Sequence, residues 1–159
     1  MKVRTDYVTN SSSSSFILGF TSEDNIASEL VNGFPKEHLD KLGAVITDVI
    51  SAERLKKSEA MDRIRGELYW QVVCDVEEDY RNRTGCSYTE SFDYRETEEG
   101  EKEIERIIND RISSKMEEIE GNSVFVEIEY SDNGGYFESD LEHEVMPNVG
   151  STIFCFNHH

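Results

Sequence analysis

Apolar residues along the chain fall into short compact runs and into longer stretches where they recur every three or four positions. The compact runs at 16–20 and 151–156 predict buried strands. In residues 124–130 the even-numbered positions are apolar and form one face, with Phe125, Glu127 and Glu129 on the other, which predicts the clearest strand of the chain. A looser alternation at 2–8 predicts one more short strand.

Four segments carry the helical period. The first begins at Thr21–Asp24, the second at Pro35, and the third runs from Ser58 to a glycine stop at Gly85. The fourth spans 101–120. Their predicted buried faces comprise Ile26, Leu30 and Val31; Leu39, Leu42, Val45, Ile46, Val49 and Ile50; Met61, Ile64, Leu68, Tyr69, Val72, Val73 and Val76; and Ile104, Ile107, Ile108, Ile112, Met116 and Ile119.

The remaining segments predict loops and turns. Residues 86–100 show no period and are predicted to form a loop. The Gly-rich stretch 131–135 predicts a turn, after which Tyr136 and Phe137 are expected to start a return strand. Residues 139–146 are expected to make one or two helical turns before Pro147. Together the pattern predicts a single α+β domain over 1–159, with about four helices packed on one small, mainly antiparallel sheet.

The negative charge of the chain is concentrated in one contiguous segment. The formal net charge is −18, with 36% hydrophobic and 31% charged residues. Residues 75–144 hold 7 Lys/Arg and 23 Asp/Glu, a net of −16, whereas residues 1–74 carry only −2. Such a surface repels nucleic acid and anionic membrane and attracts basic proteins or divalent cations. Solubility alone is the simpler interpretation of the same charge.

Cytoplasmic localisation is expected. The N-terminus has no apolar segment of a secretion signal, and no apolar run approaches the roughly 20 residues of a membrane span. Cys74, Cys86 and Cys155 show no C-x-x-C spacing, so they predict neither a disulfide framework nor a zinc knuckle.

Both ends of the chain contain distinctive sequence motifs. Lys2-x-Arg4-x-Asp6-Tyr7-Val8-Thr9-Asn10 precedes five serines (Ser11–Ser15) and Phe16. This opening resembles that of a group of small uncharacterised bacterial and phage proteins. The segments Glu129–Asp132, Leu141–His143 and His158–His159 extend the resemblance, which covers about a quarter of the chain and implies no particular activity. The serine run itself is open to three interpretations: a flexible segment, a packed loop whose hydroxyls satisfy backbone groups, or an anion-binding or modifiable cluster.

A carboxylate and imidazole group near the C-terminus is the best chemical candidate. It comprises Asp132, Glu142, His143, His158 and His159. These side chains suit a divalent metal such as zinc, or general-base chemistry. No H-x-x-x-H or H-E-x-x-H spacing supports it, the neighbours Glu142 and His143 are not expected to share a helix face, and a terminal His-His is also typical of a purification tag. No cofactor is therefore our first expectation, with a divalent metal as the alternative.

The acidic helix, taken as Glu96 to Glu120, offers a second candidate site, for a partner. Its carboxylates match the charge density of duplex DNA, because a helix rises about 1.5 Å per residue and DNA carries one charge per roughly 1.7 Å. The plain alternative is a solvated amphipathic helix with pairs such as Glu98–Lys102. The predicted contact residues, each a surrogate for a phosphate, are Glu98, Glu99, Glu101, Glu103, Glu105, Asp110, Glu117, Glu118 and Glu120.

These observations favour a non-enzymatic interaction protein. Catalytic signatures such as G-x-S-x-G and the P-loop are missing from the sequence, so no catalytic residue is predicted. We expect an acidic protein, consistent with a phage or mobile-element origin, that occupies a basic site on a nucleic-acid-binding or defence enzyme and contacts neither nucleic acid nor membrane itself. A metal-dependent or His/carboxylate enzyme at the C-terminal cluster is the alternative. A structural or regulatory subunit, pairing through a sheet edge, is a third, and the oligomeric state stays open.

Overall fold

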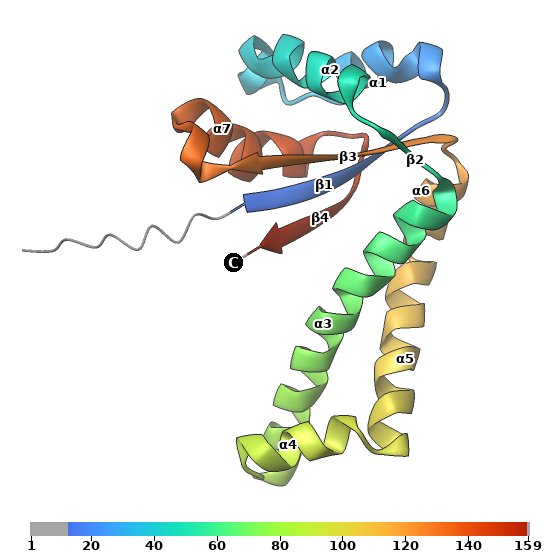
Figure 1. Cartoon of the computed structure of the whole chain (residues 1–159), viewed down its shortest axis with the longest axis vertical. Coiled ribbons are helices and arrows are strands. Elements are labelled where there is room, and N and C mark those ends of the chain that lie inside the picture. Colours follow the sequence, from blue (N-terminus) through green and yellow to red (C-terminus); the bar gives the residue numbers. More distant parts are fainter. Residues whose placement is uncertain (1–12, 159) are drawn as a thin grey trace, which may run out of the picture.

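The computed structural model describes residues 13–158, which form a four-stranded antiparallel sheet with helices on both of its faces (Figure 1). The predicted α+β class and antiparallel sheet are confirmed. The described residues contain seven α-helices, more than the predicted four. In chain order the elements are β1 (Ser13–Phe20), η1 (Glu23–Asn25), α1 (Ile26–Gly33), η2 (Lys36–Lys41), α2 (Leu42–Ser51), β2 (Arg54–Leu55), α3 (Lys57–Thr84), α4 (Tyr88–Arg95), α5 (Glu98–Ser113), α6 (Met116–Glu120), β3 (Val124–Ser131), η3 (Asp132–Gly134), α7 (Tyr136–Asp140), η4 (Leu141–Val145), η5 (Met146–Asn148) and β4 (Thr152–His158).

The sheet is built around β1, in the strand order β2-β3-β1-β4. β1 pairs with β3 along its whole length, from Ser13 opposite Ser131 to Phe20 opposite Val124. Its run from Ser14 to Phe20 is buried, as a strand covered on both faces requires. The serine run is thus partly a strand and not a loop, since residues 13–15 belong to β1. Residues 1–12, with the predicted strand at 2–8 and the first two serines, lie outside the described part.

One face of the sheet packs against α1, α2 and the η4 turn. The even-numbered side chains of β3 point to this face, as predicted, and meet Leu30, Val45 and Leu141. Val31 and Ile50 were predicted to be buried but are about half exposed. Each follows a buried residue by one position, which turns it about 100° away from the sheet. The predicted second helix is irregular in its first part, because non-helical dihedral angles at His38 interrupt η2 before α2 begins at Leu42, and Leu39 in η2 is exposed.

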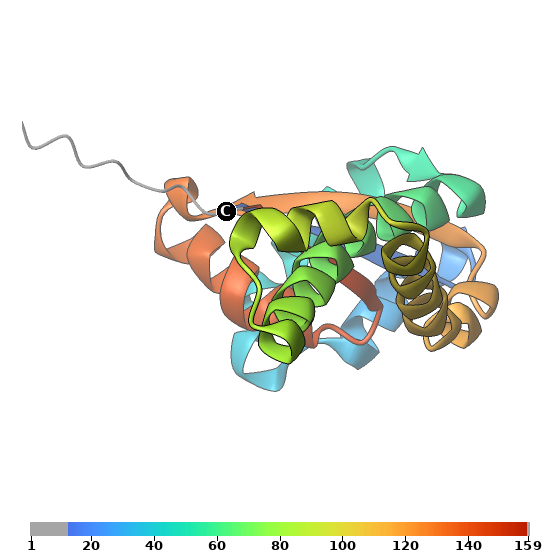
Figure 2. The ribbon, with the colours of Figure 1, turned by 90° about the horizontal axis from the view of Figure 1, so that it is seen from below.

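The opposite face of the sheet continues into a helical arm, which we define as α3, α4 and α5. In Figure 1 the arm projects away from the sheet, and in Figure 2 α3 and α5 lie side by side when seen from its free end. Ile17 and Phe125 of the sheet begin an apolar core that runs on between the two long helices through Ile64, Val72 and Ile108. The two long helices of the arm therefore pack mainly on each other.

Three local predictions are wrong for identifiable reasons. Residues 86–100 are not a loop, because Ser87 and Glu90 form a capping box that starts α4. The predicted helix 101–120 is two helices that break at Ser114 and Lys115, and its first part already begins at Glu98.

The third wrong prediction is the return strand at Tyr136 and Phe137. The chain turns through Gly135, at φ 88°, directly into α7. The second neighbour of β1 is instead β4, the strand predicted at 151–156. The helical turns predicted at 139–146 are present in α7 and η4. They were expected to end before Pro147, but a further turn, η5, includes this proline.

Candidate functional sites

The carboxylates predicted to contact a partner lie on two helices. Six of the nine are on α5, and Glu117, Glu118 and Glu120 are on α6 at the base of the arm. All are exposed except Glu103, which is partly covered. The structure therefore places them on the surface, but on two helices and not on the one continuous helix that was predicted.

Four of these carboxylates are engaged within the chain. Glu98 pairs with Lys102, Asp110 with Arg106 and Glu118 with Lys115, each three or four positions along a helix. Glu103 is held differently, since it accepts a 2.7 Å hydrogen bond from the hydroxyl of Tyr94 and lies 3.5 Å from a guanidinium nitrogen of Arg83. These four are less suited to act as phosphate surrogates than the remaining five.

Tyr94 also fixes the free end of the arm. The negative charge of Glu103, through the hydrogen bond that it accepts, raises the pKa of Tyr94, and burial acts in the same direction. The Tyr94 ring stacks on Tyr80 of α3. Tyr94 thereby joins α4 to both long helices, so the arm has a defined shape.

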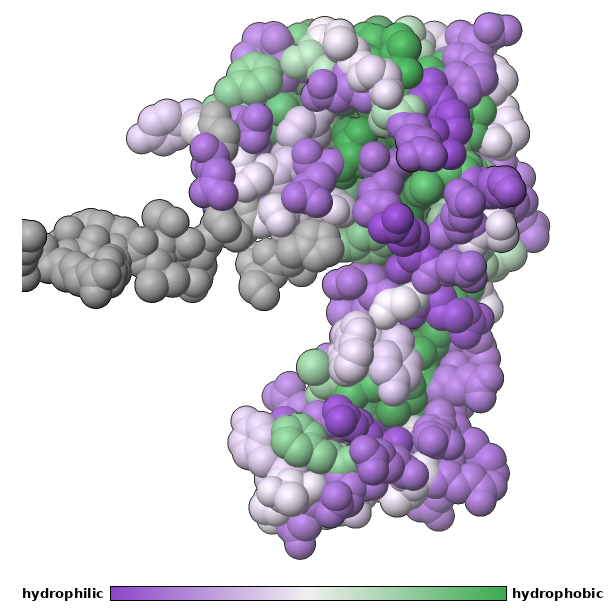
Figure 3. Space-filling view, in the orientation of Figure 1, coloured by the Kyte–Doolittle hydropathy of each residue, from purple (hydrophilic) through white to green (hydrophobic). Residues whose placement is uncertain are grey.

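A groove of about 480 Å³ runs along the arm between α3 and α5. Its floor is apolar, with Ile104 and Ile108 of the arm core, and one wall presents Tyr69 and Trp70. Trp70 is 61% exposed and Tyr69 43% exposed, and their rings meet edge to face with centroids 5.4 Å apart. The charged residues of the groove are Arg65, Arg95, Glu96, Glu101 and Glu105. In Figure 3 pale and apolar side chains gather along the middle of the arm between strongly hydrophilic ones.

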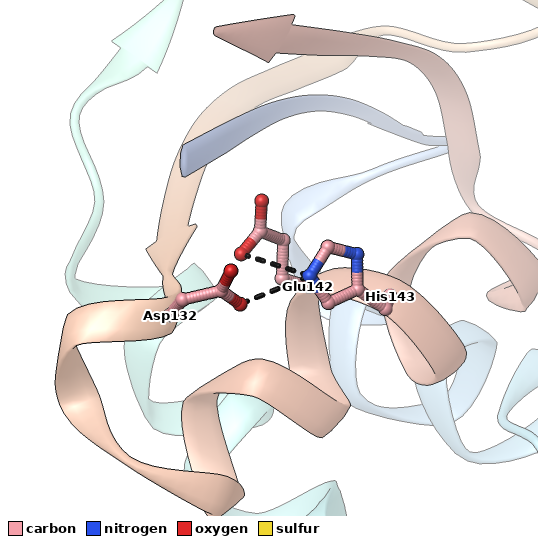
Figure 4. Close-up of side chains that lie close together, drawn as sticks. All are labelled: Asp132, Glu142 and His143. Carbon is pink, nitrogen blue, oxygen red and sulfur yellow. Dashed lines mark hydrogen bonds and ion pairs between the residues drawn. The ribbon is translucent and has the colours of Figure 1, made fainter. Parts of the chain in front are cut away.

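The second candidate site lies at the opposite side of the molecule, where β3 ends. Asp132 follows β3 in η3, and Glu142 and His143 come from η4 (Figure 4). The Nε2 atom of His143 lies 2.9 Å from Oδ1 of Asp132 and 3.6 Å from Oε2 of Glu142. One ligand atom from each of the three residues lies within 4.8 Å of the others. Residues 142 and 143 were not expected to share a helix face, and Glu142 is indeed buried while His143 is half exposed, but their ligand atoms still lie within 4.8 Å of each other in the π-helical turn η4.

Glu142 is the unusual member of this cluster. Its side chain is fully buried, whereas Asp132 is 37% and His143 50% exposed. The hydroxyl of Ser14 in β1 donates a 2.9 Å hydrogen bond to Oε1 of Glu142. Burial raises the pKa of the Cys155 thiol on β4, and the nearby charge of Glu142 adds to that effect. The cluster therefore combines a buried carboxylate, held from the sheet, with two ligands that solvent can reach.

Two predicted members of the metal site cannot be placed. The side chain of His158 and the whole of His159 lie outside the described part of the chain. Three of the five predicted residues, Asp132, Glu142 and His143, are brought together.

Sequence reasoning missed the groove. Tyr69 was assigned to the buried stripe of α3, and Trp70 and Glu96 were not singled out. Trp70 falls outside the spacing of Leu68 and Val72, and this was the available signal that it faces solvent.

Comparison with known proteins finds no matching family model, no matching curated protein and no matching solved structure. Within residues 13–158, none of the helices has both the length and the apolar character of a membrane span.

Proposed function

We propose that this chain is an interaction protein that binds a basic surface of another protein through the helical arm and the adjoining α6. The observation that carries the proposal is the position of the negative charge. The segment 75–144 carries −16, and much of it lies on helices that project from the sheet. Because the arm has its own apolar core, its carboxylates are already held in place. Little conformational entropy is then lost when they bind a partner.

Of the nine predicted contact carboxylates, those without an ion pair in the described part of the chain are the proposed contacts. They are Glu99, Glu101, Glu105, Glu117 and Glu120, all exposed. A basic partner, such as a nucleic-acid-binding or defence enzyme, would meet these five charges. The other four predicted carboxylates already interact within the chain. Five of the nine, and not all of them, would therefore stand in for phosphates.

Charge reversal tests the proposal. The variant Glu99→Lys/Glu117→Lys/Glu120→Lys reverses three charges in α5 and α6 outside the groove. The matched control Asp24→Lys/Glu37→Lys/Glu53→Lys reverses three exposed charges elsewhere. Each protein is used to capture partners from a lysate of the source organism across a salt series. We expect a basic protein that is released as salt rises, is lost by the first variant and is kept by the control. Equal capture by both variants would contradict the proposal.

A second candidate function is supported by the cluster at the end of β3. We propose, as the alternative, that Asp132, Glu142 and His143 bind a divalent metal such as zinc. Ligands about 2.0–2.2 Å from a tetrahedral zinc lie roughly 3.4 Å from one another. The separations of 2.9 and 3.6 Å around Nε2 of His143 bracket that value. Ser14 would act as an outer partner that orients the Glu142 carboxylate.

A further inference from the structure

The groove between α3 and α5 has a composition that acidity alone does not explain. Binding a basic surface through carboxylates alone does not require an exposed tryptophan on the arm. Trp70 is nevertheless the only tryptophan of the chain, and most of its surface is open to solvent. Tyr69 stands beside it, and three glutamates line the same hollow. Aromatic faces next to carboxylates are the usual surroundings of a bound organic cation.

Elsewhere in the arm, aromatic rings already hold cations of the chain itself. The guanidinium of Arg81 lies 4.1 Å from the centre of the Tyr88 ring, and that of Arg95 lies 5.5 Å from the Phe92 ring. Within residues 13–158, no such cation covers the ring of Trp70 or Tyr69. These two rings are free to receive one from outside.

The charges of the groove also favour a cation. Of its two arginines, Arg95 pairs with the buried Glu77 at 3.0 Å, while Arg65 donates to the neutral amide of Asn109 at 3.2 Å and keeps its single positive charge against three glutamates. The carboxylates of Glu96, Glu101 and Glu105 form no ion pair with any residue in the described part of the chain. The balance of available charge in the groove is therefore negative.

We propose that this groove binds an arginine side chain presented by the basic partner. The planar guanidinium would stack on Trp70 or Tyr69 and pair with Glu101 or Glu105, while its aliphatic stem covers the Ile104 floor. Arginine fits better than lysine, because guanidinium both stacks on aromatic rings and forms paired hydrogen bonds with a carboxylate. The volume of about 480 Å³ accommodates such a side chain with part of its backbone. This inference rests on the proposed function and adds to it the chemical group that is recognised.

The emission of Trp70 reports directly on this site, since the chain has no other tryptophan. The probe is a short peptide of alternating arginine and glycine, titrated into the full-length protein at low salt, with the lysine analogue as comparison. We expect saturable change of the Trp70 emission and tighter binding of the arginine peptide. Emission that stays unchanged at saturating peptide, or equal affinity for both peptides, would overturn the groove proposal.

Variants separate the groove from the general charge of the arm. In the double variant Glu101→Gln/Glu105→Gln the affinity for a dye-labelled arginine peptide should fall roughly tenfold. The matched control Glu99→Gln/Glu117→Gln loses the same charge outside the groove and should stay within about twofold. Trp70→Ala should weaken binding roughly fivefold, and Trp70→Phe should restore part of it. All five substituted positions are exposed, so circular dichroism should confirm an unchanged fold.

The outcomes distinguish the two proposals. If both double variants lower the affinity for the arginine peptide equally, the groove proposal fails, while the proposal that the acidic arm captures a basic partner still stands. If the charge-reversed variant of α5 and α6 keeps its captured partner, the proposed function fails, whatever the peptide does in the groove.

Discussion

The ring of Tyr94 stacks on the ring of Tyr80, with centroids 3.9 Å apart and ring planes within 4° of parallel. The hydroxyl of the same Tyr94 donates to Glu103 at 2.7 Å. One side chain of α4 therefore contacts α3 and α5 at once. The shape of the arm, and with it the groove, depends on this junction at its free end.

Removing only the hydroxyl of Tyr94 should weaken the junction modestly. Tyr94→Phe keeps the stack and loses the hydrogen bond to Glu103, which we expect to lower the free energy of unfolding by about 1 kcal/mol. Tyr94→Ala loses the stack as well and should cost about 2 kcal/mol more. Urea denaturation measures both values. Equal stability of the two variants would show that the stack contributes nothing.

Two glycines of the arm should respond oppositely to the same substitution. A Cβ on Gly100 would collide with the backbone carbonyl of Tyr94, where α5 begins against the end of α4. Gly100→Ala should therefore destabilise the protein by about 2 kcal/mol. Gly66 in α3 is exposed, and a Cβ there would meet no atom within 4 Å. Gly66→Ala should stabilise the protein by about 0.5–1 kcal/mol, because alanine favours a helix over glycine. Thermal unfolding of the two variants gives the signs directly.

The capping box of α4 should make stability depend on pH. The backbone N–H and the hydroxyl of Ser87 both donate to Glu90, and these bonds hold the pKa of Glu90 below its ordinary value of 4.5. Since the pKa is lower in the folded state, the stabilisation is complete above pH 4.5 and is lost as the pH falls through the folded pKa. Glu90→Gln should remove this part of the acid dependence, and Ser87→Ala should cost about 1 kcal/mol at neutral pH. The free energy of unfolding of both proteins is measured as a function of pH. If it falls by the same amount in Glu90→Gln and in wild type down to strong acid, Glu90 does not contribute to the acid dependence.

Tyr130 should matter for the sheet, whereas Tyr136 should not. The hydroxyl of the buried Tyr130 on β3 donates to Asp48 of α2 at 2.7 Å. Tyr130→Phe should therefore lower stability by about 1 kcal/mol. Tyr136 is 93% exposed, so Tyr136→Phe is the matched control and should leave stability unchanged. Chemical denaturation of both variants checks the difference.

The alternative metal site makes its own prediction. In a chain that ends at Asn157, which removes the two terminal histidines, calorimetry should detect one zinc per molecule, and His143→Ala should abolish it. Ser14→Ala should weaken zinc roughly tenfold through the Glu142 carboxylate. The control His38→Ala removes a histidine that pairs with Glu144 instead and should bind as wild type does. No zinc binding by the shortened wild-type chain would remove this candidate.

The sequence predicted best those elements that bury one face, because their apolar residues then recur at a regular spacing. The even-numbered side of β3, the run at 16–20 and the glycine stop of α3 at Gly85 all follow from local periodicity or backbone freedom. It failed where capping chemistry starts a helix that has no clear apolar period, as at Ser87, or where one extra position rotates an apolar residue away from the sheet, as at Val31 and Ile50.

The sites were predictable only in part. The cluster of Asp132, Glu142 and His143 was expected from the composition of the C-terminal segment, but composition does not show that η3 and η4 bring these side chains together. The groove depends on α3 and α5 lying side by side. No pattern within one helix could reveal that Trp70 and Glu101 line the same hollow.

Hydrogen–deuterium exchange of this protein with its captured partner tests the central claim most directly, because it reads where the partner lies. The account predicts that exchange slows in α3, α5 and α6 on binding, at Trp70 and at 99–120, while the face formed by α1 and α2 is unchanged. Slower exchange confined to α1, α2 or the sheet edge, with the arm unaffected, would contradict the claim that the acidic arm is the binding surface.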